Sequence, residues 1–362
     1  MEHRTRNRPL RCVLAALLAA AISLVLASCG GGSNQAMELL GQTFAGKHHI
    51  SSGDLALVLT VDPSGPSGLK GPLTLSVGGP FQNLGAGRLP ASDFNISLAA
   101  MGTDASLALI STGTNGYVSF QGASYKLPQA TYRRLESSFG QLGSASGGTG
   151  GGVLGRLGID PQRWLVNPQI VGDEGVDGID TTHIRAGINV AALLADLNRF
   201  LERAASVGVA GASSFPRGIP AATRQRIAAE VKHPTFNVWT GVADKALRRM
   251  EINLTVPVSG QLSALLGRAA AIGLTLEYSN LNRPQTITAP TQLQPYGQFQ
   301  DKLRVLIADF EGGLASGGGG AGVAPTTGAT SGPNYQSYTN CVTAANGNLA
   351  KMQKCAPLLN GQ

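Results

Sequence analysis

Short segments in which apolar and polar residues alternate recur along most of this 362-residue chain. A period of two is typical of a β-strand that buries one of its faces. Turns rich in Gly, Pro, Asn and Asp separate the segments, and Asp177-Gly178 has the form of a tight hairpin turn. We predict strands over residues 54–62, 73–77, 94–100, 106–110, 117–120, 169–176, 179–188, 236–240, 247–256 and 273–278. Their succession predicts an antiparallel meander.

Apolar residues at helical spacing predict helices beside these strands. The helices cover residues 37–44, 128–139, 191–205, 220–231 and 296–311. Pro220 stands where a helix begins, and Pro234 stops the same helix. Many antiparallel strands with a few inserted helices indicate an α+β fold built on one large sheet.

The first thirty residues have the pattern of an export signal. A basic stretch, residues 4–11, precedes an apolar or small run, residues 12–27, that only borders on the ~20 residues of a membrane-spanning helix. The ending Leu26-Ala27-Ser28-Cys29 resembles the lipobox of bacterial lipoproteins, in which the Cys thiol receives a diacylglycerol. We predict a signal peptide over 1–28, a tether over 29–36, and an exported protein anchored to the outer face of the bacterial cell membrane by lipidated Cys29. An ordinary signal peptide with an incidental Cys, or an uncleaved anchor, is the alternative.

The charge of the chain argues against nucleic acid as a partner. The formal charge of +7 falls to +4 without the first 28 residues, and the remaining basic residues are scattered. A surface that follows a phosphate backbone needs a denser basic patch. We therefore expect no nucleic-acid partner.

The C-terminal part differs in composition from the rest. Residues 312–333 are rich in Gly, Ala, Ser and Thr, which is typical of a flexible linker. Beyond it, Cys341 and Cys355 would lie about 21 Å apart on one straight helix, too far for a disulfide. Asn346-Gly347-Asn348 can reverse the chain between them. We predict a helical hairpin over 334–362 stapled by a Cys341–Cys355 disulfide, with two free thiols on a frayed tail as the alternative.

The sequence has no recognisable catalytic motif, and we predict neither an enzyme nor a bound metal or cofactor. Zinc-protease, nucleophile-elbow, phosphate-loop and Cys-x-x-Cys patterns do not occur. The Gly-rich run at 147–152 lacks the strand and helix of a dinucleotide site. We interpret His48-His49 as a solvated helix end and His183 as an exposed strand residue. The acids Asp173, Glu174, Asp177 and Asp180 are interpreted as solvated turn residues rather than a calcium loop.

Three features together resemble one family of envelope proteins. They are the lipobox, the run from Val176 to Ile184 that leads into residues 189–197, and the late stretch Leu276-Glu277-Tyr278-Ser279-Asn280-Leu281-Asn282. This combination resembles lipoproteins of the LppX/LprAFG type, which are similar in fold to the periplasmic carriers LolA and LolB. Over residues 37–311 the resemblance implies a strongly curved antiparallel half-barrel, with helices on its concave face and an apolar cavity for multi-acyl lipids.

Apolar stripes on two predicted helices are compatible with such a cavity. The candidates that line it are Leu193, Leu197, Phe200, Leu201, Leu303 and Ile307. Ordinary packing of helices on the sheet is the alternative for these residues. Two functions follow: a lipoprotein that binds membrane lipids or glycolipids and carries them through the envelope, or an envelope scaffold with a filled core. An exported hydrolase is a third, weaker hypothesis, and protein partners are left open.

Overall fold

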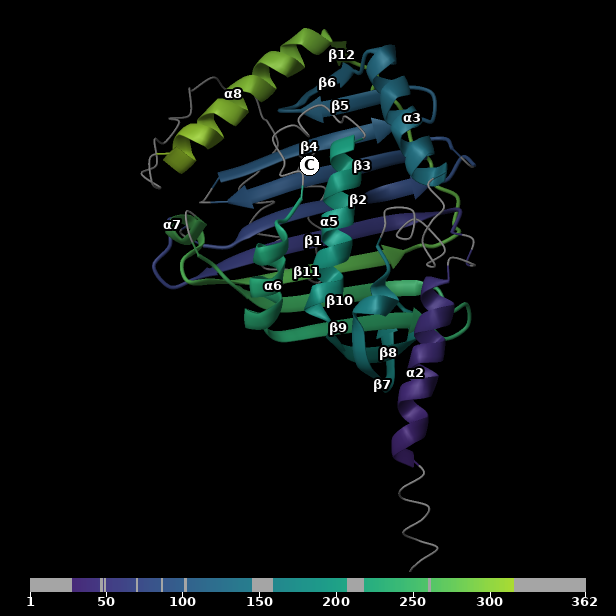
Figure 1. Cartoon of the computed structure of the whole chain (residues 1–362). Coiled ribbons are helices and arrows are strands. Elements are labelled where there is room, and N and C mark those ends of the chain that lie inside the picture. Colours follow the sequence, from purple (N-terminus) through teal and green to yellow (C-terminus); the bar gives the residue numbers. More distant parts are fainter. Residues whose placement is uncertain are drawn as a thin grey trace, which may run out of the picture.

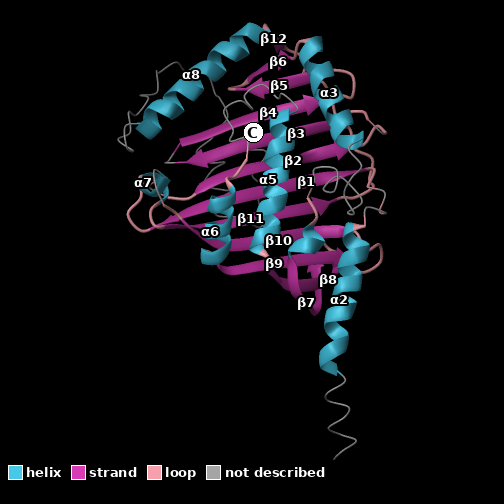
Figure 2. Ribbon diagram, viewed as in Figure 1, coloured by secondary structure: helices cyan, strands magenta, loops and turns pink. Residues whose placement is uncertain are grey.

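The computed structural model describes residues 28–45, 48, 50–69, 71–85, 87–100, 103–144, 159–206, 218–259 and 262–315. Their strands form one open sheet in the order β12-β6-β5-β4-β3-β2-β1-β11-β10-β9-β8-β7 (Figures 1 and 2). Every pairing is antiparallel except that of the two-residue β12 with β6. The predicted α+β fold on one large antiparallel sheet is thus confirmed.

The strands run through most of the described chain. Their bounds are β1 Ser52–Ser64, β2 Leu73–Gln82, β3 Ala91–Ala100, β4 Thr103–Ser111, β5 Gly116–Phe120, β6 Ala123–Lys126, β7 Leu165–Val176, β8 Ile179–Ile188, β9 Lys232–Gly241, β10 Leu247–Pro257, β11 Ala269–Ser279 and β12 Leu293–Gln294. The helices are α2 Ser28–Phe44, α3 Gln129–Ser144, η1 Pro161–Trp164, α5 Val190–Ser206, α6 Ala221–Glu230, α7 Leu262–Leu266 and α8 Tyr296–Ala315.

The strand register aligns the apolar residues of successive strands on one face of the sheet. Leu57 lies opposite Val77 on one side and Leu276 on the other, and Leu276 lies opposite Met250. Because side chains alternate between faces, this alignment sorts each strand into an apolar face and a polar face. We call these the helix face and the outer face, since the helices named below pack on the apolar one.

Two hydrophobic clusters hold helices on the helix face. The first joins α2, η1 and α5 to strands β8 to β11 through buried residues that include Leu40, Trp164, Leu194, Phe236 and Met250. The second joins Phe299 of α8 to Val118, Phe120 and Tyr125 of β5 and β6. The clusters therefore occupy opposite ends of the sheet, as the positions of α2 and α8 in Figure 1 show.

Several predicted boundaries need correction. The predicted tether at 29–36 is helical, because α2 begins at Ser28 rather than near residue 37. Its later half is fixed by buried Ala36 and Leu40, and a nucleated helix extends by one hydrogen bond per added residue. The helix that Pro234 was predicted to stop ends at Glu230, and Pro234 lies inside β9. The elements β6, β12, η1 and α7 were not predicted, because they have five residues or fewer and show no periodicity.

The predicted hairpin turn between β7 and β8 is confirmed. Asp177 and Gly178 both have positive φ, 50° and 75°, as the tight turns of twisted hairpins require. Other predictions lie outside the described residues. These are the signal peptide before Ser28, the Gly-rich run at 147–152, the linker at 312–333, and the hairpin at 334–362 with Cys341 and Cys355.

Candidate apolar site on the helix face

The middle of the helix face is apolar but is not closed by either cluster. Its side chains come from β1 to β4 and are half-buried or, for Leu109, 40% exposed. They face one another in register: Leu59 lies opposite Leu75, which lies opposite Leu98. We call this set the central apolar patch: Leu59, Leu75, Val77, Phe94, Ile96, Leu98 and Leu109.

Helix α5 crosses the strands on this face, from the level of β10 to that of β3 (Figure 1). Its first turns are core, because Val190 and Leu194 are both only 8% exposed and belong to the first cluster. At 100° per residue, Leu197 projects from the helix between the directions of Leu193 and Leu194. Leu193 packs against the first cluster, yet Leu197 is 41% exposed. The side of α5 that is buried at Leu194 is therefore not filled one turn later.

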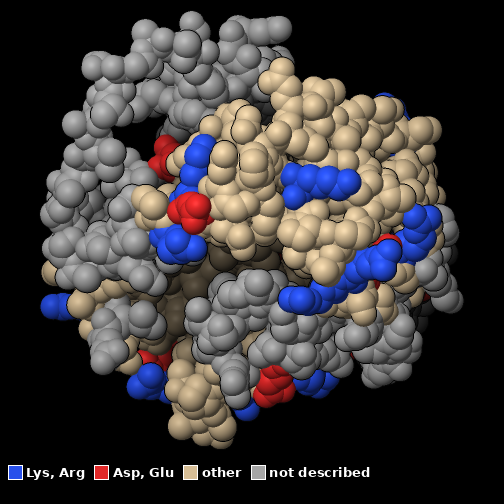
Figure 3. Space-filling view, turned by 90° about the horizontal axis from the view of Figure 1, so that it is seen from above, with Lys and Arg blue, Asp and Glu red and all other residues tan. Residues whose placement is uncertain are grey.

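The space-filling view shows a hollow in the described surface. Seen from above in Figure 3, the hollow lies near the middle of the view, and its floor carries neither Lys or Arg nor Asp or Glu colouring. A floor without Lys, Arg, Asp or Glu gives a ligand no charged group to pair with.

The six predicted lining residues have different surroundings. Leu193 packs against the first cluster and Leu303 against the second, so both take part in core packing. Phe200 and Leu201 are half-buried and belong to neither cluster. The side chain of Ile307 is outside the described set.

A buried carboxylate fixes α5, and the sequence analysis missed it. Asp196 is fully buried on α5 and accepts hydrogen bonds from Trp164 Nε1 at 3.0 Å and from the Asp160 backbone N at 2.7 Å. Arg199, one turn further along α5, is its ion-pair partner. A buried charge needs such partners, so this arrangement holds η1 against α5 and sets the position of the helix over the sheet.

Two tyrosines lie in the clusters at either side of the central apolar patch. Tyr125 is fully buried in the second cluster, and its hydroxyl has no hydrogen-bond partner in the described part of the chain. Tyr278 packs against the first cluster, and burial raises the pKa of its hydroxyl, which therefore stays protonated.

The outer face carries a polar network where the sequence analysis predicted solvated residues. His183 is not exposed: it is 4% exposed and stacks on Trp239 with ring centroids 4.3 Å apart. Its Nδ1 lies 2.8 Å from Glu174 Oε1, and its Nε2 lies 3.0 Å from Asn237 Oδ1. The indole of Trp239 donates to Glu174 Oε2 at 2.8 Å. These hydrogen bonds from Trp239 and His183 lower the pKa of Glu174.

The other predicted polar residues have simpler surroundings. Asp173 accepts a hydrogen bond from the Thr182 hydroxyl at 3.0 Å, and His48 Nε2 lies 2.9 Å from the Gln42 carbonyl oxygen near the end of α2. Within the described ranges, no group of three His, Cys, Asp or Glu side chains is placed to hold a metal ion. In the same ranges, no helix combines the length and the apolar character needed to span a membrane.

Comparison with known proteins gives structural matches only. No protein-family model and no curated protein matches the sequence. LprF from Mycobacterium bovis matches at 15% identity and a TM-score of 0.38, over 72% of this chain and 99% of LprF. LppX from Mycobacterium tuberculosis matches at 14% identity and a TM-score of 0.32, over 70% and 99% of the two chains. A LolA-superfamily protein from Nitrosomonas europaea matches at 9% identity and a TM-score of 0.17, over 69% and 94%.

The chain is thus similar to solved structures of LprF, LppX and a LolA-superfamily protein.

Proposed function

We propose that this protein is a membrane-anchored envelope lipoprotein that binds the acyl chains of lipids between α5 and the central apolar patch. The exposure of Leu197 carries the proposal. That residue lies on the buried side of α5 and is nevertheless 41% exposed, whereas Leu194 is 8% exposed. Among the described residues, this part of the helix face is only partly covered, whereas a filled core would bury it.

Hydrophobic burial supplies the binding energy in this proposal. Each buried CH₂ group contributes about 0.8 kcal/mol, so a few acyl carbons on the central apolar patch outweigh any single polar contact. Because the patch has no charged member, it suits the tails of membrane lipids or glycolipids alike and does not select a headgroup. Transport through the envelope, with Cys29 as the lipidated anchor, is the further part of the proposal.

A scaffold with a filled core is the second candidate function. The two hydrophobic clusters favour it, because both ends of the helix face are already packed with side chains. The two functions differ in one measurable quantity, the amount of lipid that copurifies with the chain.

The test is native mass spectrometry of the processed protein purified from a bacterial host, because the covalent acyl mass of an anchor is distinguishable from dissociable lipid. We expect bound lipid in the parent and less in Leu197→Trp, since the indole fills acyl space. Leu135→Trp is the matched control, because Leu135 is a 36% exposed Leu on α3. It should retain the lipid of the parent.

Melting temperatures of the same samples separate the two functions. A lipid site predicts an unchanged melting temperature for Leu197→Trp together with lost lipid. A filled core predicts overpacking, which costs about 1–3 kcal/mol, with no lipid in the parent. The second pattern would establish the scaffold.

A further inference from the structure

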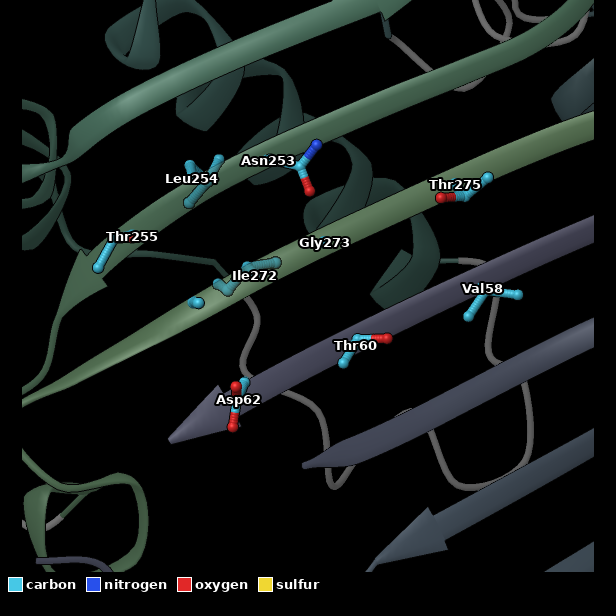
Figure 4. Close-up of a pocket in the computed structure, with 10 residues that line it drawn as sticks. Val58, Thr60, Asp62, Asn253, Leu254, Thr255, Ile272, Gly273 and Thr275 are labelled. Atoms are coloured by element: carbon cyan, nitrogen blue, oxygen red, sulfur yellow. The ribbon is translucent and has the colours of Figure 1, made fainter. Parts of the chain in front are cut away.

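The outer face holds a hollow of about 400 Å³ over β1, β11 and β10, on the side of the sheet opposite to the helices (Figure 4). The register explains its shape. Thr60 lies opposite Gly273, which lies opposite Asn253; Asp62 lies opposite Ala271, which lies opposite Thr255. The middle strand thus carries the two smallest residues between two strands with longer side chains. We call the result the outer-face trough.

The lining of the trough is rich in unused hydrogen-bonding groups. In the described part of the chain, the side chains of its five polar lining residues form no hydrogen bond or ion pair with one another or with any neighbour: Thr60, Asp62, Asn253, Thr255 and Thr275. The two walls stand two strand spacings apart, about 10 Å. Hydroxyls and an amide both donate and accept, whereas the single carboxylate only accepts.

We propose that the outer-face trough binds a neutral saccharide chain lying along β11. A saccharide offers hydroxyls that both donate and accept, which matches the walls, and C–H surface that matches Val58 and Ala271. The lining contains no Lys or Arg and one Asp, so it disfavours phosphates and uronates. One carboxylate does not make a metal site. Strand addition by a peptide is excluded at this place, because β1, β10 and β11 are each paired on both sides.

Gly273 determines the depth of the trough. A Cβ at this position would lie 3.3 Å from Asn253 Oδ1, so a larger side chain would stand between the walls. Gly273→Val therefore removes the space, while a β-branched residue suits a strand. Thr60→Val and Thr255→Val each remove one hydroxyl and keep the shape. Thr74→Val is the matched control, because Thr74 lies opposite Thr60 on β2 and does not line the trough.

The experiment is isothermal titration of the processed full chain with three neutral tetrasaccharides of glucose, N-acetylglucosamine and mannose. A tetragalacturonate and a Gly-Ser octapeptide are the comparison probes. We expect at least one neutral probe to bind. Thr60→Val and Thr255→Val should each weaken that binding roughly three- to tenfold, the effect of one hydrogen bond. Gly273→Val should abolish it, and Thr74→Val should not change it.

The proposal is overturned if no neutral probe binds at concentrations on the order of 10 mM, a weak-binding limit. Equal binding by all variants, or tighter binding of the uronate or the peptide, overturns it too. If Gly273→Val fails to fold by circular dichroism, the two Thr variants decide. Bound lipid is counted on the same samples: because the trough lies on the other face, its variants should keep the lipid of the parent. Failure of saccharide binding is thereby distinguished from failure of the proposed lipid site.

Discussion

At the scale of single residues, the unpartnered hydroxyl of Tyr125 is a cost to the fold. A buried hydroxyl without a partner loses its hydrogen bonds to water, a penalty of about 1–3 kcal/mol. We expect Tyr125→Phe to raise the free energy of unfolding by about 1 kcal/mol, measured by urea denaturation. Tyr132→Phe is the contrast, because the Tyr132 hydroxyl lies 3.3 Å from the Ser111 hydroxyl. That variant should lower stability, and a gain from both would contradict the assignment.

Glu174 makes stability depend on pH. Hydrogen bonds from Trp239 and His183 lower its pKa in the folded state, so its carboxylate stabilises the fold above the pKa of the unfolded chain. This stabilisation is lost as the pH falls through the folded pKa. The melting temperature of the parent should exceed that of Glu174→Gln at pH 7, and the difference should shrink below about pH 4.5, the ordinary range of a Glu carboxyl.

The control for this prediction is Glu251→Gln on the outer face. The side chain of Glu251 has no hydrogen-bond partner in the described residues, so the variant reports the loss of one carboxylate without the network. A pH-independent difference between the parent and Glu174→Gln would contradict the role given to the hydrogen bonds.

At the scale of elements, the packing of α5 changes along its length, from core at Leu194 to exposed at Leu197. Leu194→Ala removes a side chain of the first cluster and should cost about 2–5 kcal/mol. Leu197→Ala, one turn later, should cost less than about 1 kcal/mol, as exposed positions do. Chemical denaturation of both variants measures the difference. Equal large costs would mean that the core extends under the whole helix.

The elements themselves were largely predictable from the sequence. The strand from Leu55 to Val61 and the helix with Leu193, Leu194 and Leu197 show their periods directly, since each must bury one side. The short strand β6 and the burial of His183 were not predictable. A strand of four residues shows no period, and alternation assigns His183 to the polar face without showing that Trp239 and Glu174 cover it there.

At the scale of the whole molecule, α2 connects the sheet with the proposed anchor. Its later half packs through Leu40, and Cys29 lies in its first turn. Two or three acyl chains on Cys29 would hold the protein on a membrane surface. Cys29→Ala should abolish incorporation of a fatty-acid probe and release the protein from the membrane fraction or stall its processing. Continued labelling of that variant would refute the anchor.

The sequence by itself determined the class of fold, because alternation, helical stripes and turn residues act between neighbours along the chain. It also determined which residues of each strand share a face, because successive side chains point to opposite sides of the sheet. Only the tertiary structure decided which parts of those faces are packed and which are exposed. Leu194 and Leu197 are the same residue type on the same apolar stripe of one predicted helix. The packing around them places Leu194 in the core and leaves Leu197 exposed. More than two hundred residues separate Thr60 from Gly273 in the sequence. Only the strand register places these two residues and Asn253 side by side, where they form the trough. Register and packing depend on contacts between distant segments, which no local pattern encodes.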